Sequence, residues 1–261
     1  LLDPPLHEFI PATDEEIEEL ARELGKDPGE MKKRAAELRE ANPMLGHRGC
    51  RLGITYPEVY EMQARAIFEA AKALADRGVD ARPEVMIPLV GEPKELSILR
   101  ELVERVAAEV LGRDTDTVPF HIGTMIEIPR AAIVADEIAE HADFFSFGTN
   151  DLTQMAYGFS RDDAGSYIKD YLKRGILRKD PFQSLDKRGV GALVKMAVDK
   201  GRLANPDLHL GVCGEHGGDP ESIYFFHQVG LDYVSCSPYR VPVARLAAAH
   251  AVLKARIRGI T

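Results

Sequence analysis

Residues 121 to 151 limit the possible folds more than any other part of the chain, because they read as one strand–helix–strand unit. An apolar run over 120–128 comes first, and Pro129 then suits the first turn of a helix. Apolar residues recur after it at helical spacing. A second apolar run, 144–147, leads into Gly-Thr-Asn-Asp at 148–151. The pattern predicts two strands joined by a helix, the repeating unit of parallel β/α proteins.

Two carboxylates lie at the ends of these predicted strands, Glu127 in the first and Asp151 after the second. If the strands are parallel neighbours, both side chains emerge at the same edge of the sheet. Two hard oxygen ligands at one edge suit Mg²⁺, which usually takes one or two protein carboxylates and completes its shell with water and substrate oxygens. The alternative is that one carboxylate caps a helix or pairs with a neighbour such as Arg130. Spacing alone leaves this alternative open.

Strand-length apolar runs alternate with helical patterns along the whole chain. Seven strand candidates lie near residues 1–3, 44–48, 84–90, 120–127, 144–148, 208–213 and 232–236. We expect an α/β fold of the (β/α)₈ TIM-barrel type, truncated at the N-terminus, because one strand is lacking and the chain starts inside another. The functional site would then lie at the carboxyl ends of the strands. An open doubly wound sheet is less favoured, since no GxGxxG motif follows an early strand.

We expect a single barrel domain over residues 1–261. Two segments interrupt the alternation of strands and helices. A charged stretch over about 13–41 reads as a helical insertion that starts with a capping box. Residues of about 152–185 read as a long loop with short helical pieces, and such loops often serve as lids or binding loops. The strand-like start and the lack of an initiator Met suggest a piece of a longer protein.

Composition argues against several classes of function. The formal net charge of −9 disfavours an electrostatic nucleic-acid binder, although a small site can still be basic. No apolar run reaches the ~18 residues of a membrane span, and the start lacks a signal peptide. Three cysteines in 261 residues make no disulfide framework and indicate a reducing compartment. We therefore expect a cytoplasmic protein, or a plastid one if the source is a plant, without nucleic-acid or membrane partners.

Two further segments carry side chains that can do chemistry. Arg48 and Arg51 lie in the turn HRGCR, where guanidinium groups beside glycines could bind phosphate or carboxylate; a pair of surface arginines is an equal alternative. Cys213 precedes the loop GEHGGDP, so its thiol could act as an acid, a base or a nucleophile. Most free cysteines are instead small buried apolar residues. His216 either orients its neighbours or is structural, and with Cys213 and Glu215 it matches no zinc-ligand spacing.

Several motifs of the chain closely resemble one known family. The segments are LGHRGCRLG, PEVMIPLVG, GTMIEIPRAA, FFSFGTNDLTQM, CGEHGGDP and DYVSCSPYRVPVARLAAA. They resemble the C-terminal phosphoenolpyruvate (PEP)/pyruvate-binding barrel of the pyruvate, phosphate dikinases, which are PEP-utilizing enzymes, and the resemblance covers essentially the whole chain. PEP synthases and enzyme I of the sugar phosphotransferase system share the FGTNDLTQ and CG elements. The forms GHRGCRLG and CGEHGGDP look like those of the dikinases.

The resemblance implies a metal site and a substrate site. Glu127 and Asp151 match the two Mg²⁺ ligands of the family, and both belong to its substrate site. Asn150, with the backbone around Gly148 and Thr149, matches the substrate-binding turn. Mg²⁺ bridging substrate oxygens would stabilise the negative charge that forms as pyruvate enolises.

The resemblance also implies groups that handle the phosphoryl group and a proton. Arg48 matches an arginine near the phosphoryl group. Arg161 falls where enzyme I has another phosphate-binding arginine, which is a looser match. Cys213 matches the residue that exchanges a proton with C3 of the substrate. Two further phosphate-binding arginines of the family would precede Leu1, outside this chain.

As a whole, the resemblance implies the PEP/pyruvate half-site of a reaction that converts ATP, phosphate and pyruvate to AMP, diphosphate and PEP. The phosphoryl group would arrive on a histidine of a separate swivelling domain, and ATP would bind to another domain. This chain alone would therefore lack the full activity. A homodimer is a family expectation. The alternatives are a barrel of the PEP synthase or enzyme I type, and a non-catalytic truncated barrel.

Overall fold

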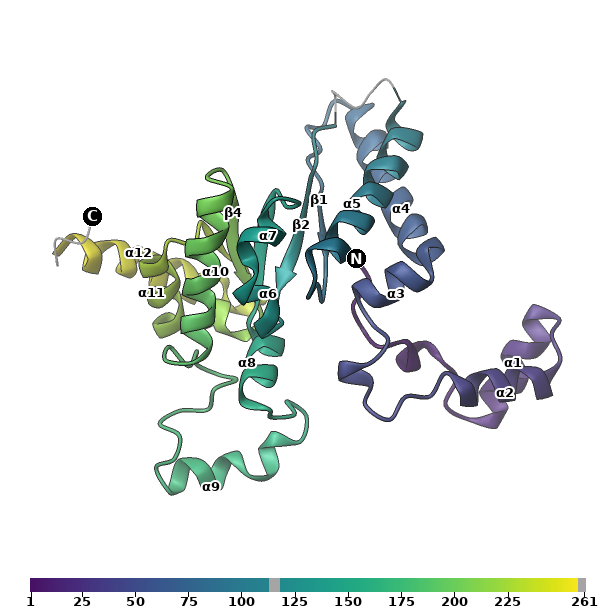
Figure 1. Cartoon of the computed structure of the whole chain (residues 1–261), viewed down its shortest axis with the longest axis horizontal. Coiled ribbons are helices and arrows are strands. Elements are labelled where there is room, and N and C mark those ends of the chain that lie inside the picture. The colour runs from purple at the N-terminus through teal and green to yellow at the C-terminus, as the bar shows by residue number, and fades with distance from the viewer. Residues whose placement is uncertain (113–117, 258–261) are drawn as a thin grey trace.

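A parallel five-stranded sheet forms the centre of the computed structural model, which describes residues 1–112 and 118–257 (Figure 1). The strands follow one another in the order β1-β2-β3-β4-β5, and every neighbouring pair is parallel. Their bounds are Glu84–Ile87 (β1), His121–Ile126 (β2), Phe144–Gly148 (β3), His209–Cys213 (β4) and Tyr233–Val234 (β5). The predicted α/β class is therefore confirmed.

The described strands form an open sheet. Within residues 1–112 and 118–257, β1 and β5 stand at opposite ends of the strand order, so these strands alone do not close into a barrel. The expected domain over 1–261 includes two stretches outside the described residues. None of the helices in the described ranges is long and apolar enough to cross a membrane.

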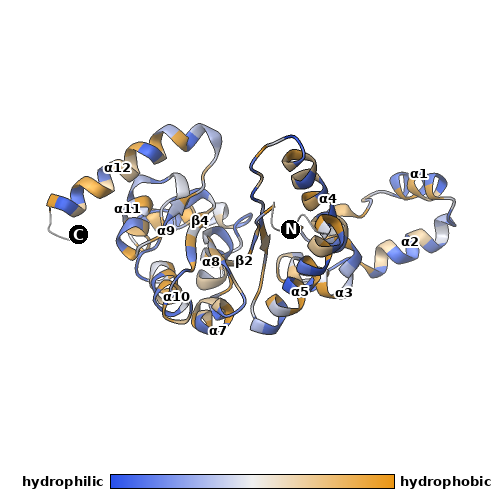
Figure 2. Ribbon diagram, turned by 90° about the horizontal axis from the view of Figure 1, so that it is seen from above, coloured by the Kyte–Doolittle hydropathy of each residue, from blue (hydrophilic) through white to orange (hydrophobic). Residues whose placement is uncertain are grey.

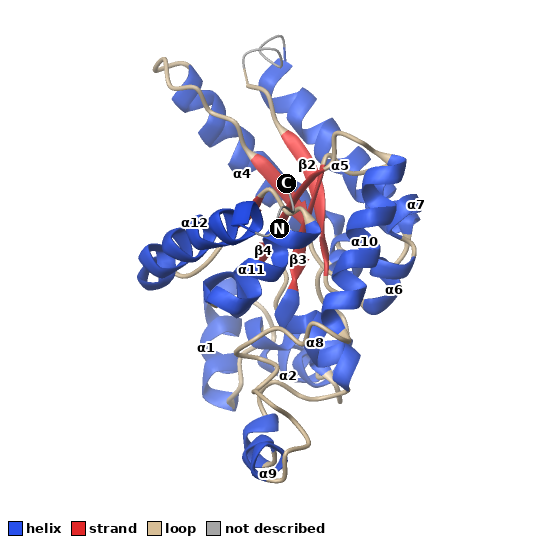
Figure 3. Ribbon diagram, turned by 90° about the vertical axis from the view of Figure 1, so that its left-hand side faces the viewer, coloured by secondary structure: helices blue, strands red, loops and turns tan. Residues whose placement is uncertain are grey.

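Helices separate the strands and cover the sheet (Figures 1 and 3). The α-helices are α1 (Asp14–Leu24), α2 (Pro28–Glu37), α3 (Cys50–Thr55), α4 (Pro57–Ala75), α5 (Pro93–Leu111), α6 (Pro129–Ile133), α7 (Ala135–Ala139), α8 (Thr149–Tyr157), α9 (Ile168–Lys173), α10 (Val190–Ala204), α11 (Pro220–Val229) and α12 (Val241–Ile257). Short 3₁₀ turns lie at Leu6–Phe9, Pro43–Leu45, Ala164–Ser166, Glu215–Gly218 and Pro238–Arg240.

The two faces of the sheet differ, because successive side chains of a strand point to opposite sides. One face packs with α4, α5 and α10 in the main core, and these amphipathic helices show apolar and polar residues in alternation (Figure 2). Its residues include Val85, Ile122, Phe145 and Leu210. The other face carries small and polar residues such as Ser146 and Cys213. Gly211 lies on it as well, where an added Cβ would be 2.0 Å from the ring of Tyr233. On this polar face, Cys213 is the last residue of its strand and lies at the carboxyl edge of the sheet.

The carboxyl ends of the strands all point to one side of the molecule. Helix α8, helix α9 and the hairpin of α1 and α2 lie on that side (Figures 1 and 3). The hairpin starts with a capping box, in which Thr13 accepts a bond from the Glu16 N–H and Glu16 accepts one from the Thr13 N–H. The segments that interrupt the strand–helix alternation thus gather at the edge where a β/α protein carries its site.

The predicted strand at residues 1–3 is absent from the structure. The segment does run beside β1, since the amine of Leu1 donates to the carbonyl of Met86 at 2.7 Å. However, Pro4 and Pro5 follow directly and have no N–H groups with which to continue a ladder. The apolar run therefore ends as an extended segment that packs against the sheet edge.

The predicted strand at 44–48 is wrong as well. Pro43 instead opens the 3₁₀ turn Pro43–Leu45, which closes with a bond from the Gly46 N–H to the Pro43 carbonyl at 3.1 Å. Only two apolar residues lie between that proline and that glycine, which is too short a run to specify a strand.

The helices around the central unit also differ from expectation. The one helix expected after Pro129 is divided into α6 and α7 at Val134, whose ψ of 28° lies outside the helical range. The loop expected over 152–185 begins later, because α8 continues to Tyr157 and ends at Gly158, where φ is 66°. Asp151 consequently lies in the first turn of a helix.

Strands β3 and β5 each follow an aspartate that holds the neighbouring strand in place. Asp143 accepts a hydrogen bond from the N–H of Ile122 at 2.7 Å, and Arg100 of α5 pairs with it at 3.1 Å. Asp232 likewise accepts a hydrogen bond from an N–H of β4, and Arg202 of α10 forms an ion pair with Asp232 at 3.0 Å. These aspartates tie the amino ends of adjacent strands together.

We expect Asp143→Ala to lower the free energy of unfolding by about 1–3 kcal/mol, because it leaves the buried N–H of Ile122 without its acceptor. Urea unfolding followed by circular dichroism measures the change. Glu101→Ala, at an exposed position of α5, is the control and should change stability by less than about 0.5 kcal/mol. Equal unfolding midpoints for the two variants would contradict this role of Asp143.

Candidate active site

Three strands deliver their last residues to one edge of the sheet. Glu127 follows β2, the turn 148–151 joins β3 to α8, and Cys213 ends β4. The register pairs Gly148 with Cys213. Glu127 and Asp151 therefore emerge at the same edge, as the strand–helix–strand pattern predicts, and Cys213 joins them from the adjacent strand.

Glu127 is a buried carboxylate, 1% exposed, in a closely fitted place. Its Oε1 accepts a hydrogen bond from the N–H of Leu89 at 2.6 Å. Its Oε2 lies 2.8 Å from where a Cβ on Gly148 would be, so this position requires glycine. Burial and the charges of Asp3 and Asp151 raise the pKa of Glu127 well above its usual value, against the opposing effect of the Leu89 N–H. Glu127 thus sits in a strongly acidic neighbourhood.

The first turn of α8 carries three of the predicted site residues. The Thr149 hydroxyl donates to the carbonyl of Cys213 at 3.2 Å. The amide oxygen of Asn150 accepts from the N–H of Glu215 at 3.4 Å. Gly214 makes room for that amide, because its φ is 99° and an added Cβ would lie 3.2 Å from it. These bonds join the start of α8 to the loop after β4.

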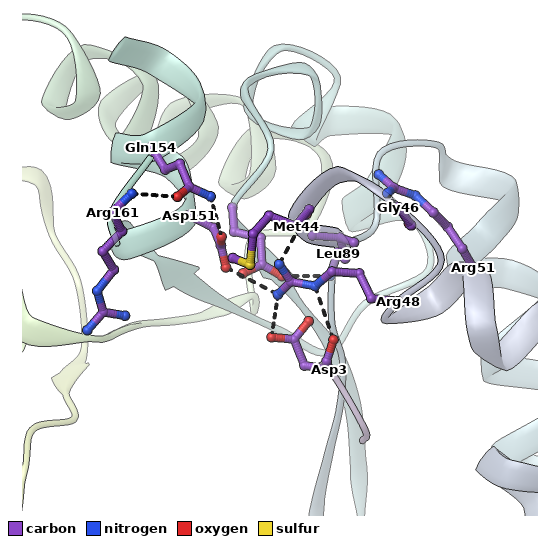
Figure 4. Close-up of polar contacts among 10 residues, drawn as sticks. Asp3, Met44, Gly46, Arg48, Arg51, Leu89, Asp151, Gln154 and Arg161 are labelled. Atoms are coloured by element: carbon purple, nitrogen blue, oxygen red, sulfur yellow. Dashed lines mark hydrogen bonds and ion pairs between the residues drawn. The ribbon is translucent and has the colours of Figure 1, made fainter. Parts of the chain in front are cut away.

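Arg48 is buried, 3% exposed, and reaches the edge from a segment far away in the sequence. Its guanidinium pairs with Asp3 at 2.7 Å and with Asp151 at 3.4 Å, and it also donates to the carbonyls of Asp3 and Met44 (Figure 4). Burial opposes its charge, but the bond to Asp3 and the charges of Asp3, Asp151 and Glu127 raise its pKa overall. Arg48 thus compensates the charge of the carboxylate cluster.

The thiol of Cys213 lies beside this cluster, and its sulfur donates to the carbonyl of Phe147 at 3.6 Å. Burial raises the pKa of Cys213, and Glu127 and Asp151 raise it further, whereas a hydrogen bond with Ser146 lowers it. The thiol is therefore protonated at neutral pH and suited to donate a proton.

We expect alkylation of Cys213 by iodoacetamide to stay slow through pH 8 and to accelerate only above the usual thiol range, since the thiolate is the reactive form. Mass spectrometry of peptides after timed quenching measures the rate. Cys213→Ser supplies the background from Cys50 and Cys236. A rate that already levels off below pH 8 would contradict the raised pKa.

Two predicted arginines do not join the cluster. The guanidinium of Arg161 points away from Asp151 and lies 3.8 Å from Glu215, although its backbone N–H binds Gln154 at 2.8 Å (Figure 4). Arg161 lines a hollow of about 870 Å³ beside the edge. Arg51 also points away and donates to backbone carbonyls of its own turn. Of the predicted arginines, only Arg48 meets the carboxylates in this structure.

Asp3 also belongs to the cluster, although it was not predicted from the sequence. It bridges to Arg48, and its charge acts on both Glu127 and Cys213. A signal was present, because a carboxylate followed closely by proline is the pattern that drew attention to Glu127. The apolar Leu1-Leu2 start directed the interpretation to a strand instead.

Ser146 and Tyr233 were missed as well. Burial raises the pKa of both Cys213 and Tyr233, and hydrogen bonding with Ser146 opposes this rise. The available signal was a single serine among phenylalanines in FFSFG, at the strand position that points to the polar face. Ser146 of β3 thus connects Cys213 of β4 with Tyr233 of β5.

His216 is fully buried and contacts Thr149, one of the predicted site residues. Its Nδ1 is 2.8 Å from the hydroxyl oxygen of Thr149, and its Nε2 is 2.8 Å from the carbonyl oxygen of Pro181. Burial lowers the pKa of His216. The imidazole thus joins α8 to the loop before α10, and both the orienting and the structural interpretation agree with these contacts.

The donor set of the cluster suits Mg²⁺. Asp3 and Asp151 pair with the Arg48 guanidinium, and a divalent cation would offset the burial and the carboxylate charges that raise the Glu127 pKa. In the described residues, Oδ1 of Asp3 is buried without a hydrogen-bond partner. Within the same ranges, no three His, Cys, Asp or Glu side chains form a ready-made metal cage. Few protein ligands, completed by water and substrate, are typical of Mg²⁺.

A family described as PEP-utilising enzyme, PEP-binding domain, matches residues 1–253. The chain therefore belongs to this family of PEP-binding domains. It is 60% identical over 255 residues to "Pyruvate, phosphate dikinase 1, chloroplastic" of Arabidopsis thaliana, covering 97% of this chain and 26% of that protein. It is also 60% identical to "Pyruvate, phosphate dikinase" of Clostridium symbiosum over 253 residues (97% and 29%) and of Rhizobium meliloti (strain 1021) over 257 residues (98% and 29%). The chain thus spans between 26% and 29% of the length of these relatives.

Proposed function

We propose that this chain is the PEP/pyruvate half-site of a pyruvate, phosphate dikinase. The observation that carries the proposal is the convergence of Glu127, Asp151 and Cys213 on one sheet edge, in a chain 60% identical to proteins of that name. The whole protein would convert ATP, phosphate and pyruvate to AMP, diphosphate and PEP. Because this chain spans about a quarter of its relatives, we place the ATP-binding and phosphohistidine domains in the rest of the protein.

Glu127 and Asp151 would hold Mg²⁺ at the mouth of the site. When bound, Mg²⁺ supplies positive charge next to the carboxylate and enolate oxygens of the substrate. Arg48 neutralises part of the negative charge of Asp3 and Asp151, so that an anionic substrate can approach. Its fork of N–H donors also matches phosphoryl oxygens.

Cys213 would carry the proton. Its raised pKa keeps the thiol protonated, so that it can give a proton to C3 as PEP loses its phosphoryl group and becomes pyruvate. Giving up this proton leaves Cys213 as a thiolate, and in the reverse direction that thiolate takes a proton from the pyruvate methyl group and becomes the thiol again. Since the amide oxygen of Asn150 is bound by the Glu215 N–H, its NH₂ group is left to donate to a substrate oxygen.

Arg161 would bind the phosphoryl group after a side-chain rotation. It is half exposed and pairs only loosely with Glu215, at 3.8 Å. An exposed pair of this length contributes little stability, so the guanidinium can turn toward an anion at the edge.

We also propose that the sheet is part of a (β/α)₈ barrel, within one domain over 1–261. Five successive parallel strands, joined by helices and arranged in chain order, agree with this architecture. A homodimer and a cytoplasmic or plastid location remain predictions. Analytical ultracentrifugation tests the first of these.

The full-length protein provides the test of the function. We expect PEP to form from pyruvate and ATP only when inorganic phosphate is present, with AMP and diphosphate as the other products. Chromatographic analysis of the nucleotides, together with a coupled assay of PEP, measures this. PEP formation without phosphate would favour the PEP synthase type, and its absence under all conditions would favour a non-catalytic barrel.

A further inference from the structure

Leu89, two residues after the end of β1, has a left-handed backbone with a φ of 63°. It is the one non-glycine residue with a positive φ in the described part of the chain. This conformation is unfavourable for an L-residue because it brings the Cβ too close to the following carbonyl oxygen, and the Leu89 side chain is fully buried. Strained backbone of this kind persists where the surroundings fix it, often at functional sites.

Gly49 and Cys50 fix this turn from the neighbouring segment. The N–H of Cys50 donates to the carbonyl of Pro88 at 3.1 Å, and its thiol donates to the carbonyl of Leu89 at 3.2 Å. Burial raises the pKa of Cys50, so the thiol keeps its proton and remains a donor. Gly49 makes the close approach possible, because an added Cβ would lie 2.7 Å from the Cβ of Leu89.

The turn aims one backbone group at the candidate metal ligand. The N–H of Leu89 lies 2.6 Å from Oε1 of Glu127. Oε2, the other oxygen of the Glu127 carboxylate, lies close to Gly148. A right-handed or extended conformation at Leu89 would point this N–H elsewhere, since the direction of an N–H is set by the backbone angles. The strained conformation therefore determines which Glu127 oxygen is already bound.

We propose that Leu89, held by Gly49 and Cys50, is a positioning residue that binds Oε1 of Glu127 and thereby fixes the carboxylate so that Oε2 is the oxygen presented to a metal ion. This inference rests on the proposed function, because it assigns the binding mode of one proposed ligand. Groups that orient metal ligands typically change metal affinity by 10–100-fold when they are lost. The segment that contains Gly49 and Cys50 also contains Arg48. Its contact with the Leu89 turn therefore sets the distance between Arg48 and Glu127.

Gly49→Ala tests the inference in the whole chain, since its methyl group would displace the Leu89 turn. We expect at least a tenfold weaker binding of oxalate, a mimic of enolpyruvate, in the presence of Mg²⁺. Gly91→Ala is the matched control, because its Cβ would meet nothing closer than 3.7 Å and should leave the affinity unchanged. Isothermal titration calorimetry measures both, after circular dichroism has confirmed folding.

Cys50→Ala and Cys50→Ser provide a second test that does not depend on Gly49→Ala folding. Alanine removes the donor to the Leu89 carbonyl, whereas serine restores one. We expect the Mg²⁺-dependent affinity to fall in the alanine variant and to recover in the serine variant. In ligand-free protein, the amide proton of Leu89 should resonate far downfield by NMR, as expected for a short bond to a carboxylate. It should move upfield in Cys50→Ala but not in Cys50→Ser.

The outcomes separate the two proposals. If the wild type binds oxalate with Mg²⁺, and Gly49→Ala and Cys50→Ala bind it equally well, the positioning role is overturned while the proposed function stands. A general loss of thermal stability without a selective loss of Mg²⁺-dependent binding also overturns it. If the folded wild type shows no Mg²⁺-dependent binding, the proposed function fails and this inference fails with it.

Discussion

Cys213→Ala should lower the turnover of the full-length protein by at least about 100-fold, because proton transfer by a positioned side chain typically contributes 10²–10⁴-fold. The variant should still bind oxalate with Mg²⁺ at nearly the wild-type affinity, since Glu127 and Asp151 are unchanged. A coupled assay of pyruvate and PEP, together with calorimetric titration, measures the two quantities. The separation of turnover from binding is the signature of a proton carrier.

Cys236→Ala is the control for this prediction, because Cys236 is another half-buried free cysteine and lies just after the neighbouring strand β5. We expect its turnover to resemble that of the wild type. Wild-type-like turnover in Cys213→Ala would exclude the thiol as the essential proton carrier. A loss of Mg²⁺–oxalate binding in that variant would instead indicate a structural role for Cys213.

Glu127→Gln should weaken oxalate binding by at least about tenfold when Mg²⁺ is present and should change it little when Mg²⁺ is absent. Glutamine keeps an oxygen that can accept the Leu89 N–H, so the packing around it is retained. What the variant loses is the negative charge that a hard cation requires. Calorimetric titrations in Mg²⁺ and in EDTA measure the difference.

Glu92→Gln is the matched control, because Glu92 is exposed in the loop after β1 and pairs with Arg130. It should leave both titrations unchanged. Equal losses in Glu127→Gln with and without the metal would mean that Glu127 acts on the substrate or on the fold, and would remove it from the set of metal ligands.

The sequence predicted the part of the site that depends on local pattern. One strand–helix–strand unit placed Glu127 and Asp151 at a common edge, because parallel strands send their carboxyl ends to the same side. Cys213 was found in the same way, from an apolar run ending in a glycine-rich loop. Each apolar run that leads to one of these residues is shorter than about ten residues, a length over which single-sequence periodicity can be detected.

Contacts between distant segments could not be predicted. Arg48 meets Asp3 and Asp151 across 45 and 103 positions of sequence, and no periodicity reports such a pair. The resemblance places Arg48 near the phosphoryl group, which stays a prediction, and the structure adds its ion pairs with Asp3 and Asp151. The left-handed turn at Leu89 could not be predicted either, because it too depends on a distant segment. A leucine carries no local signal for a positive φ, and here tertiary contacts with Gly49 impose it.

The two short apolar stretches at residues 1–3 and 44–48 were predicted to be strands, but apolar content alone was not sufficient to form them. Both lie next to prolines, at Pro4 and Pro43, and the missing N–H groups end any ladder before a strand can form. The first stretch nevertheless runs beside β1 through the bond from Leu1 to Met86. Apolar content predicted the packing of that segment correctly but not its hydrogen bonding.

The most direct test of the central claim is calorimetric titration of the folded chain with oxalate, with and without Mg²⁺. We expect binding that requires Mg²⁺ and disappears in Asp151→Ala, since two carboxylates at one sheet edge are proposed to hold the ion that binds the ligand. Binding that is equally strong in EDTA, or that persists in Asp151→Ala, would contradict the metal-assisted PEP/pyruvate site.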